Sequence, residues 1–283
     1  MSNSPRGYLD IHGHFGVPLS EEELRKQLES FWKVDFMVDE PWAWTAEGIL
    51  PCLDKANVND AAACLEEIRR GDTFEIPNDG YAVNTLYNGV MLSSESLEPV
   101  LQELDVRAAV CHVHPDAFKK GSDGRPSPLI DVAFDTARTI TDMLYKGVFR
   151  RHRNIKWVFA HCGGALPVLA GRLSLLGTEP WVPNPLGLKR AEIEDSLSRL
   201  RVDTAATAKT GLFPAIEMVG VGNIIYGADC GVPCSTEATM AENQRDVEDI
   251  EARLFNETGI VGRNGWDLFP AAAKRADAGG KTS

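Results

Sequence analysis

Short apolar runs rich in β-branched residues alternate with amphipathic segments along most of the chain. The strand-like runs occupy residues 8–15, 80–89, 107–115, 155–164, 200–208 and 223–230. Helical spacing of apolar residues is found between several of them, at residues 96–104, 129–152 and 185–200. Strands that alternate with helices form βαβ units around a parallel sheet. The pattern therefore predicts an α/β fold. Because no internal repeat or linker divides the chain, we expect one domain over residues 1–283.

Histidine is concentrated at the ends of these strand-like runs. Five of the six histidines lie there: His12 and His14 in DIHGHF, His112 and His114 in VCHVHP, and His161 in FAHCGG. Asp229 ends the run NIIYGAD, where an unpaired carboxylate would be costly to bury. Parallel α/β folds build their sites at the carboxyl ends of strands. Imidazole and carboxylate are good Zn²⁺ ligands, so the pattern indicates a divalent metal site with a position open for water or substrate.

For two histidine pairs, the sequence does not decide between metal ligands and packing or surface residues. His12 and His14 would point into one space if their strand is continuous, because residues i and i+2 share a face. An HxH pair alone is equally compatible with surface or core histidines. His112 and His114 also share a face, with His114 at the end of the run where a barrel opens. We therefore expect His114 in the site and His112 as a packed, hydrogen-bonded core histidine.

Composition excludes several classes of partner. The formal net charge is −12, which argues against nucleic acid and anionic membrane surfaces as partners. No apolar run approaches the roughly 18 residues that a membrane span needs. The first residues, MSNSPRGYLD, lack the apolar core of a signal peptide. The six cysteines form no CxxC pair and are interpreted as reduced thiols. These features favour a cytoplasmic protein.

The ordered motifs DIHGHF, VHP, FAHCGG and YGAD resemble the amidohydrolase superfamily. More narrowly, they resemble its metal-dependent decarboxylase branch, which includes aminocarboxymuconate-semialdehyde, γ-resorcylate and fungal 6-methylsalicylate decarboxylases. NDGYAVNTLYNGVML and RNGWDLFP are similar to the same branch, and the resemblance covers most of residues 8–270. It implies a (β/α)8 TIM-type barrel with one divalent metal ion, zinc first and manganese as the alternative. The implied activity is that of a carbon–carbon lyase, a non-oxidative decarboxylase of a small aromatic, salicylate-type carboxylic acid, in a homodimer.

The resemblance also implies roles for individual residues. His12, His14, His114 and Asp229 match the metal ligands, and His161 matches the acid/base residue. The proton donor to the aromatic ring of the substrate is either His161 or Asp229. Other contacts to substrate stay unassigned, with candidates at Asn84, Arg138 and residues 41–45.

Two features narrow the chemistry within this branch. The resorcylate enzymes carry a glutamate where this chain has Gly164, so a His–Glu dyad cannot form on the HCGG turn. This departure favours the methylsalicylate-like group. No lysine ends a histidine-bearing run, which favours one metal ion over a pair bridged by a carboxylated lysine.

The number of strands does not match a complete barrel. A (β/α)8 barrel has eight strands, whereas six convincing runs can be counted in this chain. The helix-like residues 45–58 lead directly into helix-like residues 59–71, so about two strands are missing after residue 58 and the barrel is expected to be distorted or incomplete. Residues 31–38 could replace a strand, or a partner chain could cover the gap. Two alternatives to a decarboxylase are a hydrolase of the same fold, such as a lactonase, and a degenerate barrel without catalytic activity.

Overall fold

The computed structural model describes residues 8–14, 20–37, 61–73, 78–87, 89–117, 119–232 and 235–279. Their centre is a five-stranded, wholly parallel sheet with the strand order β1-β4-β5-β6-β7. These strands are β1 (Tyr81–Asn84), β4 (Val110–His114), β5 (Lys156–Phe159), β6 (Arg201–Asp203) and β7 (Ile224–Ile225). A short antiparallel pair, β2 (Leu86–Tyr87) with β3 (Val90–Met91), follows β1. The strand order follows the chain, so the expected α/β fold is confirmed.

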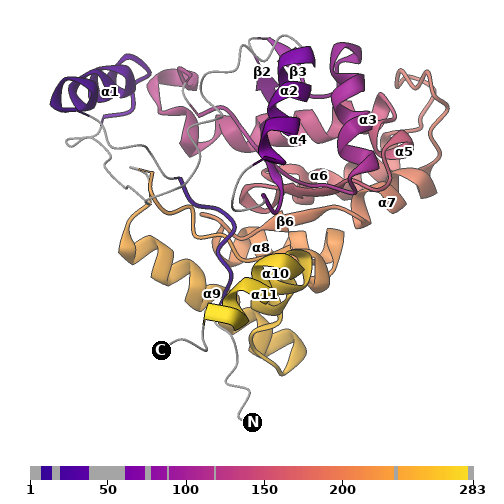
Figure 1. Ribbon diagram of the computed structural model, residues 1–283. Helices are drawn as coiled ribbons and strands as arrows, with labels where there is room; N and C mark the ends of the chain where they lie inside the picture. The colour runs from indigo at the N-terminus through magenta and orange to yellow at the C-terminus, as the bar shows by residue number, and fades with distance from the viewer. Residues whose placement is uncertain are drawn as a thin grey trace.

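Helices connect the strands and pack around the sheet (Figure 1). Their bounds are α1 (Glu21–Lys33), α2 (Ala61–Gly71), α3 (Glu98–Val106), α4 (Asp131–Tyr145), α5 (Val148–Arg151), α6 (Leu166–Leu176), α7 (Arg190–Ser198), α8 (Ala208–Val219), α9 (Glu237–Phe255), α10 (Ile260–Leu268) and α11 (Pro270–Gly279). Between β4 and β7 each parallel step crosses through at least one helix, which is the βαβ arrangement that the alternating pattern predicts. None of the described helices is both long and apolar enough to cross a membrane.

The alternation of side chains along β4 separates the core from the site. Cys111 and Val113 are fully buried and belong to the main apolar core between sheet and helices. His112 and His114 occupy the alternate positions and therefore point to the opposite face of the sheet. Burial of each apolar side chain contributes about 1.5–3 kcal/mol, so a register slip of one residue, which would exchange the two faces, is strongly disfavoured.

Residues 8–14 lie beside the segment that follows β7. Ile11 donates a backbone hydrogen bond to the carbonyl of Tyr226 (3.2 Å), and His14 donates one to Cys230 (2.7 Å). The side chain of Asp10 accepts from the backbone of Ala228 on the same segment. This first run therefore extends the parallel arc beyond β7, and β1 lies at the opposite end of the arc.

The expected gap in the barrel falls between residues 14 and 81, a stretch that includes residues outside the described ones. Among the described residues, no strand lies between residues 8–14 and β1, which are the two ends of the arc. Residues 61–71 form α2, as expected for part of the helix-like segment 59–71, whereas residues 45–58 lie outside the described ones. The suggestion that residues 31–38 replace a strand is wrong for the described part, because residues 31–33 end α1 and residues 34–37 form no strand.

Candidate metal centre

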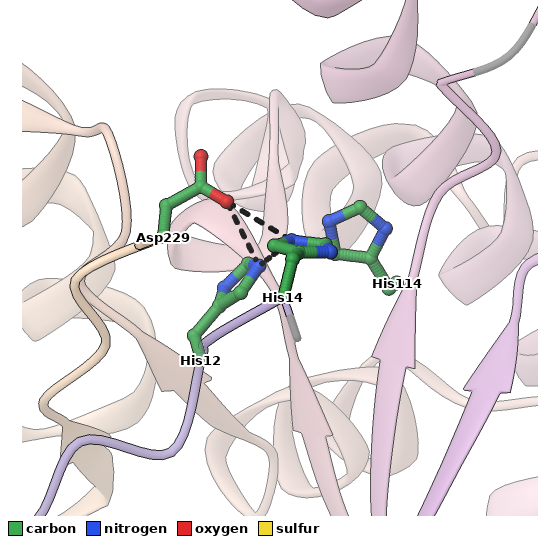
Figure 2. A group of neighbouring side chains, drawn as sticks. All are labelled: His12, His14, His114 and Asp229. Atoms are coloured by element: carbon green, nitrogen blue, oxygen red, sulfur yellow. Dashed lines mark hydrogen bonds and ion pairs between the residues drawn. The ribbon is translucent and has the colours of Figure 1, made fainter. Parts of the chain in front are cut away.

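Four side chains converge at the carboxyl end of the sheet (Figure 2). His12 and His14 come from the first run, His114 ends β4, and Asp229 follows β7. One ligand atom of each lies within 4.8 Å of those of the other three. The Nε2 atoms of His12 and His14 are 3.1 Å apart, and Asp229 Oδ1 lies 3.1 Å from His14 Nε2 and 3.2 Å from His12 Nε2. Nitrogen and carboxylate oxygen atoms directed at one point are a donor set that suits a divalent cation.

A backbone contact orients the ring of His114. Its Nδ1 donates a hydrogen bond to the carbonyl of Pro115 at 2.7 Å. This contact places the ring proton on Nδ1 and leaves the lone pair of Nε2 for the cluster. A histidine ligand whose other nitrogen is hydrogen-bonded in this way is typical of protein metal sites. The structure thus brings together all four predicted ligands, and metal binding by them stays a prediction.

His161 lies beside this cluster, on the turn after β5. Its Nε2 is 3.7 Å from Asp229 Oδ2, and its ring centroid is 5.1 Å from that of His12 and 5.1 Å from that of His114. His161 has a φ of 55° and Asp229 has a φ of 58°. Left-handed backbone is unfavourable for residues with a Cβ by roughly 1–2 kcal/mol. Such conformations persist where the surrounding structure imposes them, often at functional sites.

Sequence reasoning missed Asp203, the last residue of β6. Asp203 is fully buried, and its Oδ2 lies 2.8 Å from His12 Nδ1 and 2.8 Å from His112 Nε2. The signal was present in RVDTAA, where a carboxylate ends an apolar strand, as Asp229 does. This contact confirms that His112 is hydrogen-bonded, but His112 is only partly buried and lies beside His12 rather than in the apolar core.

The charges in the site are strongly coupled. Burial lowers the pKa of His12, but the carboxylates of Asp203 and Asp229 outweigh burial and raise that pKa to about 10. Burial raises the pKa of Asp229, but hydrogen bonds with His12, His14 and His161 hold it well below its usual range. The pKa of His114 is well below its usual range because of burial and the neighbouring imidazoles. The carboxylates are therefore ionised at neutral pH and His114 is uncharged, and a divalent cation would replace the proton that His12 otherwise holds.

The turn that carries His161 admits no side chain at position 164. Gly164 has φ 63° and ψ −130°, and a Cβ added there would lie 2.2 Å from the carbonyl oxygen of Ala133. This is a backbone conformation that glycine alone adopts readily. The absence of a His–Glu dyad on this turn therefore has a steric basis as well as a sequence basis.

The residues suggested for contact with substrate differ in where the structure places them. Asn84 ends β1 in register with His114, so it stays a candidate for contact with substrate. Arg138 is exposed on α4, where it pairs with Asp135 at 3.2 Å, and this surface position gives no support to a contact with substrate. Residues 41–45 lie outside the described part of the chain. Cys162, the neighbour of His161, is buried in the main core.

Comparison with known proteins identifies the family. The profile of the amidohydrolase family matches residues 37–258. A 6-methylsalicylic acid decarboxylase from Aspergillus aculeatus is 32% identical over 232 residues, which cover 78% of this chain and 68% of that protein. The chain belongs to the amidohydrolase family.

One further curated relative and one solved structure are also similar to this amidohydrolase. A 6-methylsalicylic acid decarboxylase from Penicillium expansum is 28% identical over 60% of this chain and 53% of its own length. This chain thus spans between about half and two thirds of the length of these two curated relatives. A dihydroxybenzoic acid decarboxylase from Polaromonas sp. JS666, solved with manganese and 2-nitroresorcinol, shares the fold, with a TM-score of 0.59 and 18% identity over 88% of this chain and 75% of its own. The named relatives are decarboxylases, and hence carboxy-lyases, and the solved neighbours are (β/α)8 barrels.

Proposed function

We propose that this chain is a metal-dependent decarboxylase of a small aromatic acid of the salicylate type. The observation that carries the proposal is the convergence of His12, His14, His114 and Asp229 within 4.8 Å, with His161 beside them. The curated 6-methylsalicylic acid decarboxylases support the substrate class. The intact set of side chains favours an enzyme over a degenerate barrel.

The residues present fit one divalent cation. The Nε2 atoms of the three histidines and Oδ1 of Asp229 would hold it, and three nitrogen donors with one carboxylate oxygen suit zinc. Manganese is the alternative, and the Polaromonas relative contains it. Bound there, the cation supplies positive charge that orients the substrate carboxylate and its neighbouring hydroxyl and withdraws electron density from the ring.

Decarboxylation requires one proton at the ring carbon that carries the carboxylate. The bond between that carbon and the carboxylate then breaks, its electron pair stays on the ring, the new C–H bond persists and CO₂ leaves. The two oxygens of Asp229 have different neighbours. Oδ1 faces His12 and His14. Oδ2 lies 3.7 Å from His161 Nε2 and 3.3 Å from the hydroxyl of Ser235. A proton held between His161 and Asp229 Oδ2 lies next to the cluster, and either residue is placed to deliver it.

Release of CO₂ beside elemental analysis of the purified protein tests the proposal. We expect about one zinc or manganese ion per chain and CO₂ release from 6-methylsalicylate that a chelator abolishes. The matched control substrate is 2-methylbenzoate, which lacks the hydroxyl next to the carboxylate and should release none. Acid release from simple lactones without decarboxylation would favour the hydrolase alternative. Bound metal with neither activity would favour the non-catalytic barrel.

A further inference from the structure

The side chain of Asp203 contacts four groups around the site. Besides its two imidazole contacts, its Oδ1 accepts the backbone N–H of His161 at 2.9 Å and that of Ala205 at 3.0 Å. An ionised carboxylate has about four acceptor positions. Two ring N–H groups and two backbone N–H groups therefore fill the acceptor positions of Asp203.

We propose that Asp203 is a positioning residue that sets the tautomer of His12 and so directs His12 Nε2 at the metal. This inference rests on the metal centre of the proposed function. An ionised carboxylate only accepts hydrogen bonds, so the contact of 2.8 Å with His12 Nδ1 requires a proton on that nitrogen. The neutral ring then carries its lone pair on Nε2, the atom that faces His14 and Asp229.

The same carboxylate keeps His112 out of the ligand set. His112 Nε2 lies 2.8 Å from Asp203 Oδ2, so its Nε2 proton is held there and that nitrogen has no lone pair to offer. His112 and His114 share a strand face, which made them competitors in the sequence. Asp203 therefore decides between them through a hydrogen bond from a different strand.

A second cation among His12, His112 and Asp203 is the alternative interpretation, because their ligand atoms also lie within 4.8 Å of one another. Two observations argue against it. Asp203 Oδ1 already accepts two backbone N–H groups, and both imidazole contacts with Oδ2 are of hydrogen-bond length at 2.8 Å. His12 would also have to bridge two cations as a doubly deprotonated ring. The group is better explained as a hydrogen-bonded brace.

The brace extends to the acid/base candidate. One of the two backbone N–H groups that Asp203 accepts belongs to His161, whose φ of 55° is unfavourable for a residue with a Cβ. Asp203 thus holds the turn that aims His161 at Asp229. One buried carboxylate sets the orientation of a predicted metal ligand and of the neighbouring proton carrier.

Cobalt titration of metal-depleted protein tests this role, with Co²⁺ alone as the probe. Asp203→Asn keeps the shape but presents an amide N–H to one of its partners, which favours the His12 tautomer with the proton on Nε2. We expect Co²⁺ affinity to fall about 10- to 100-fold, the usual cost of losing an outer partner of a ligand. The visible absorption of bound Co²⁺ should also change, since loss of His12 alters its ligand field.

Glu251→Gln is the matched control. Glu251 is also a buried carboxylate that accepts two backbone N–H groups, from Gly259 at 2.6 Å and Val261 at 2.7 Å, but it lies on α9. This variant should lower the melting temperature and leave Co²⁺ affinity unchanged. Equal affinity of Asp203→Asn and the unaltered chain, or an equal loss in Glu251→Gln, would overturn the positioning role.

A measurement on the unaltered chain covers the case in which Asp203→Asn does not fold. Nitrogen-15 spectra of the zinc-loaded protein should show His12 with its proton on Nδ1, and a proton on Nε2 would overturn the proposal. An unaltered chain that binds no Co²⁺ or Zn²⁺ would overturn both the metal centre and the brace. A chain that binds metal as predicted but releases no CO₂ would overturn the decarboxylase alone.

Discussion

Asp229 and His161 face each other across 3.7 Å, from Oδ2 to Nε2, and both have left-handed backbone. The two residues follow different strands, β7 and β5, so their contact depends on the parallel arc that brings the ends of those strands together. The other oxygen of Asp229 faces His12 and His14. The proposed metal binding and the proposed proton transfer therefore both involve this carboxylate, and variants of the two residues should separate them.

Removal of a predicted ligand should abolish metal retention and activity together. For His12→Ala or Asp229→Ala we expect metal content close to zero, because each change deletes one of four donor atoms. Elemental analysis and CO₂ release on the same preparation check this. Full metal occupancy in either variant would show that the ligand set is wrong.

Loss of the acid/base candidate should leave the metal in place. In His161→Asn we expect full metal content and turnover reduced by roughly 10²-fold or more, the usual scale of an acid/base contribution. His152→Asn is the control, because His152 is a buried histidine that contacts Glu98 at 3.0 Å and lies outside the cluster. It should lower stability while turnover per folded chain is kept. Metal loss in His161→Asn would instead make His161 a ligand.

Substitution of Gly164 should destabilise the turn that carries His161. In Gly164→Ala the new Cβ would meet the carbonyl oxygen of Ala133 at 2.2 Å, in addition to the strain of positive φ. We expect the free energy of unfolding to fall by roughly 3 kcal/mol or more, since strain alone costs about 1–3 kcal/mol. Gly187 has a φ of 60°, and an added Cβ there would have no atom within 4 Å, so Gly187→Ala measures the cost of positive φ without a clash. Urea unfolding of both variants measures the difference, and equal losses would contradict the clash.

The ion pair at Glu98 should make stability depend on pH. Hydrogen bonds from Arg151 hold the pKa of Glu98 below its usual value, against the opposing effect of burial. A depressed carboxyl pKa stabilises the fold above the unfolded-state pKa, and this contribution is lost as pH falls through the lower folded-state pKa. Unfolding at neutral pH should therefore show Glu98→Gln less stable by about 1 kcal/mol or less.

The pH series decides whether that difference comes from the charge. The difference in stability between Glu98→Gln and the unaltered chain should close as pH falls below 4.5, the ordinary pKa of a glutamate side chain. Glu95→Gln, a change at an exposed position three residues earlier, serves as the control and should show little difference at either pH. A gap that persists at the acid end would assign the effect to packing.

Unpaired strand edges should make the protein associate. Among the described residues, the outer edges of β1 and of residues 8–14 have no strand partner, and exposed strand edges favour pairing with another chain. Large apolar side chains are also exposed, including Trp181 at 68% and Val168 at 73%. We expect a homodimer by light scattering. A monodisperse monomer of high thermal stability would contradict this prediction.

Much of this protein follows from local sequence. Strand-like and helix-like runs differ in period, so their alternation along the chain is enough to predict a parallel α/β fold. Placement of His12, His14, His114 and Asp229 at strand ends needs only the rule that parallel strands present their carboxyl ends at one edge. The structure gathers these residues at that edge.

Tertiary structure decided what no local pattern contains. The contact between His12 and Asp203 joins residues 191 positions apart, so neither segment alone indicates the partner of the other. The hydrogen bond that distinguishes His112 from His114 goes to the same carboxylate, which comes from β6. Such contacts form only when separate strands are aligned in register by packing of the core, because hydrogen bonds depend on geometry to within tenths of an ångström.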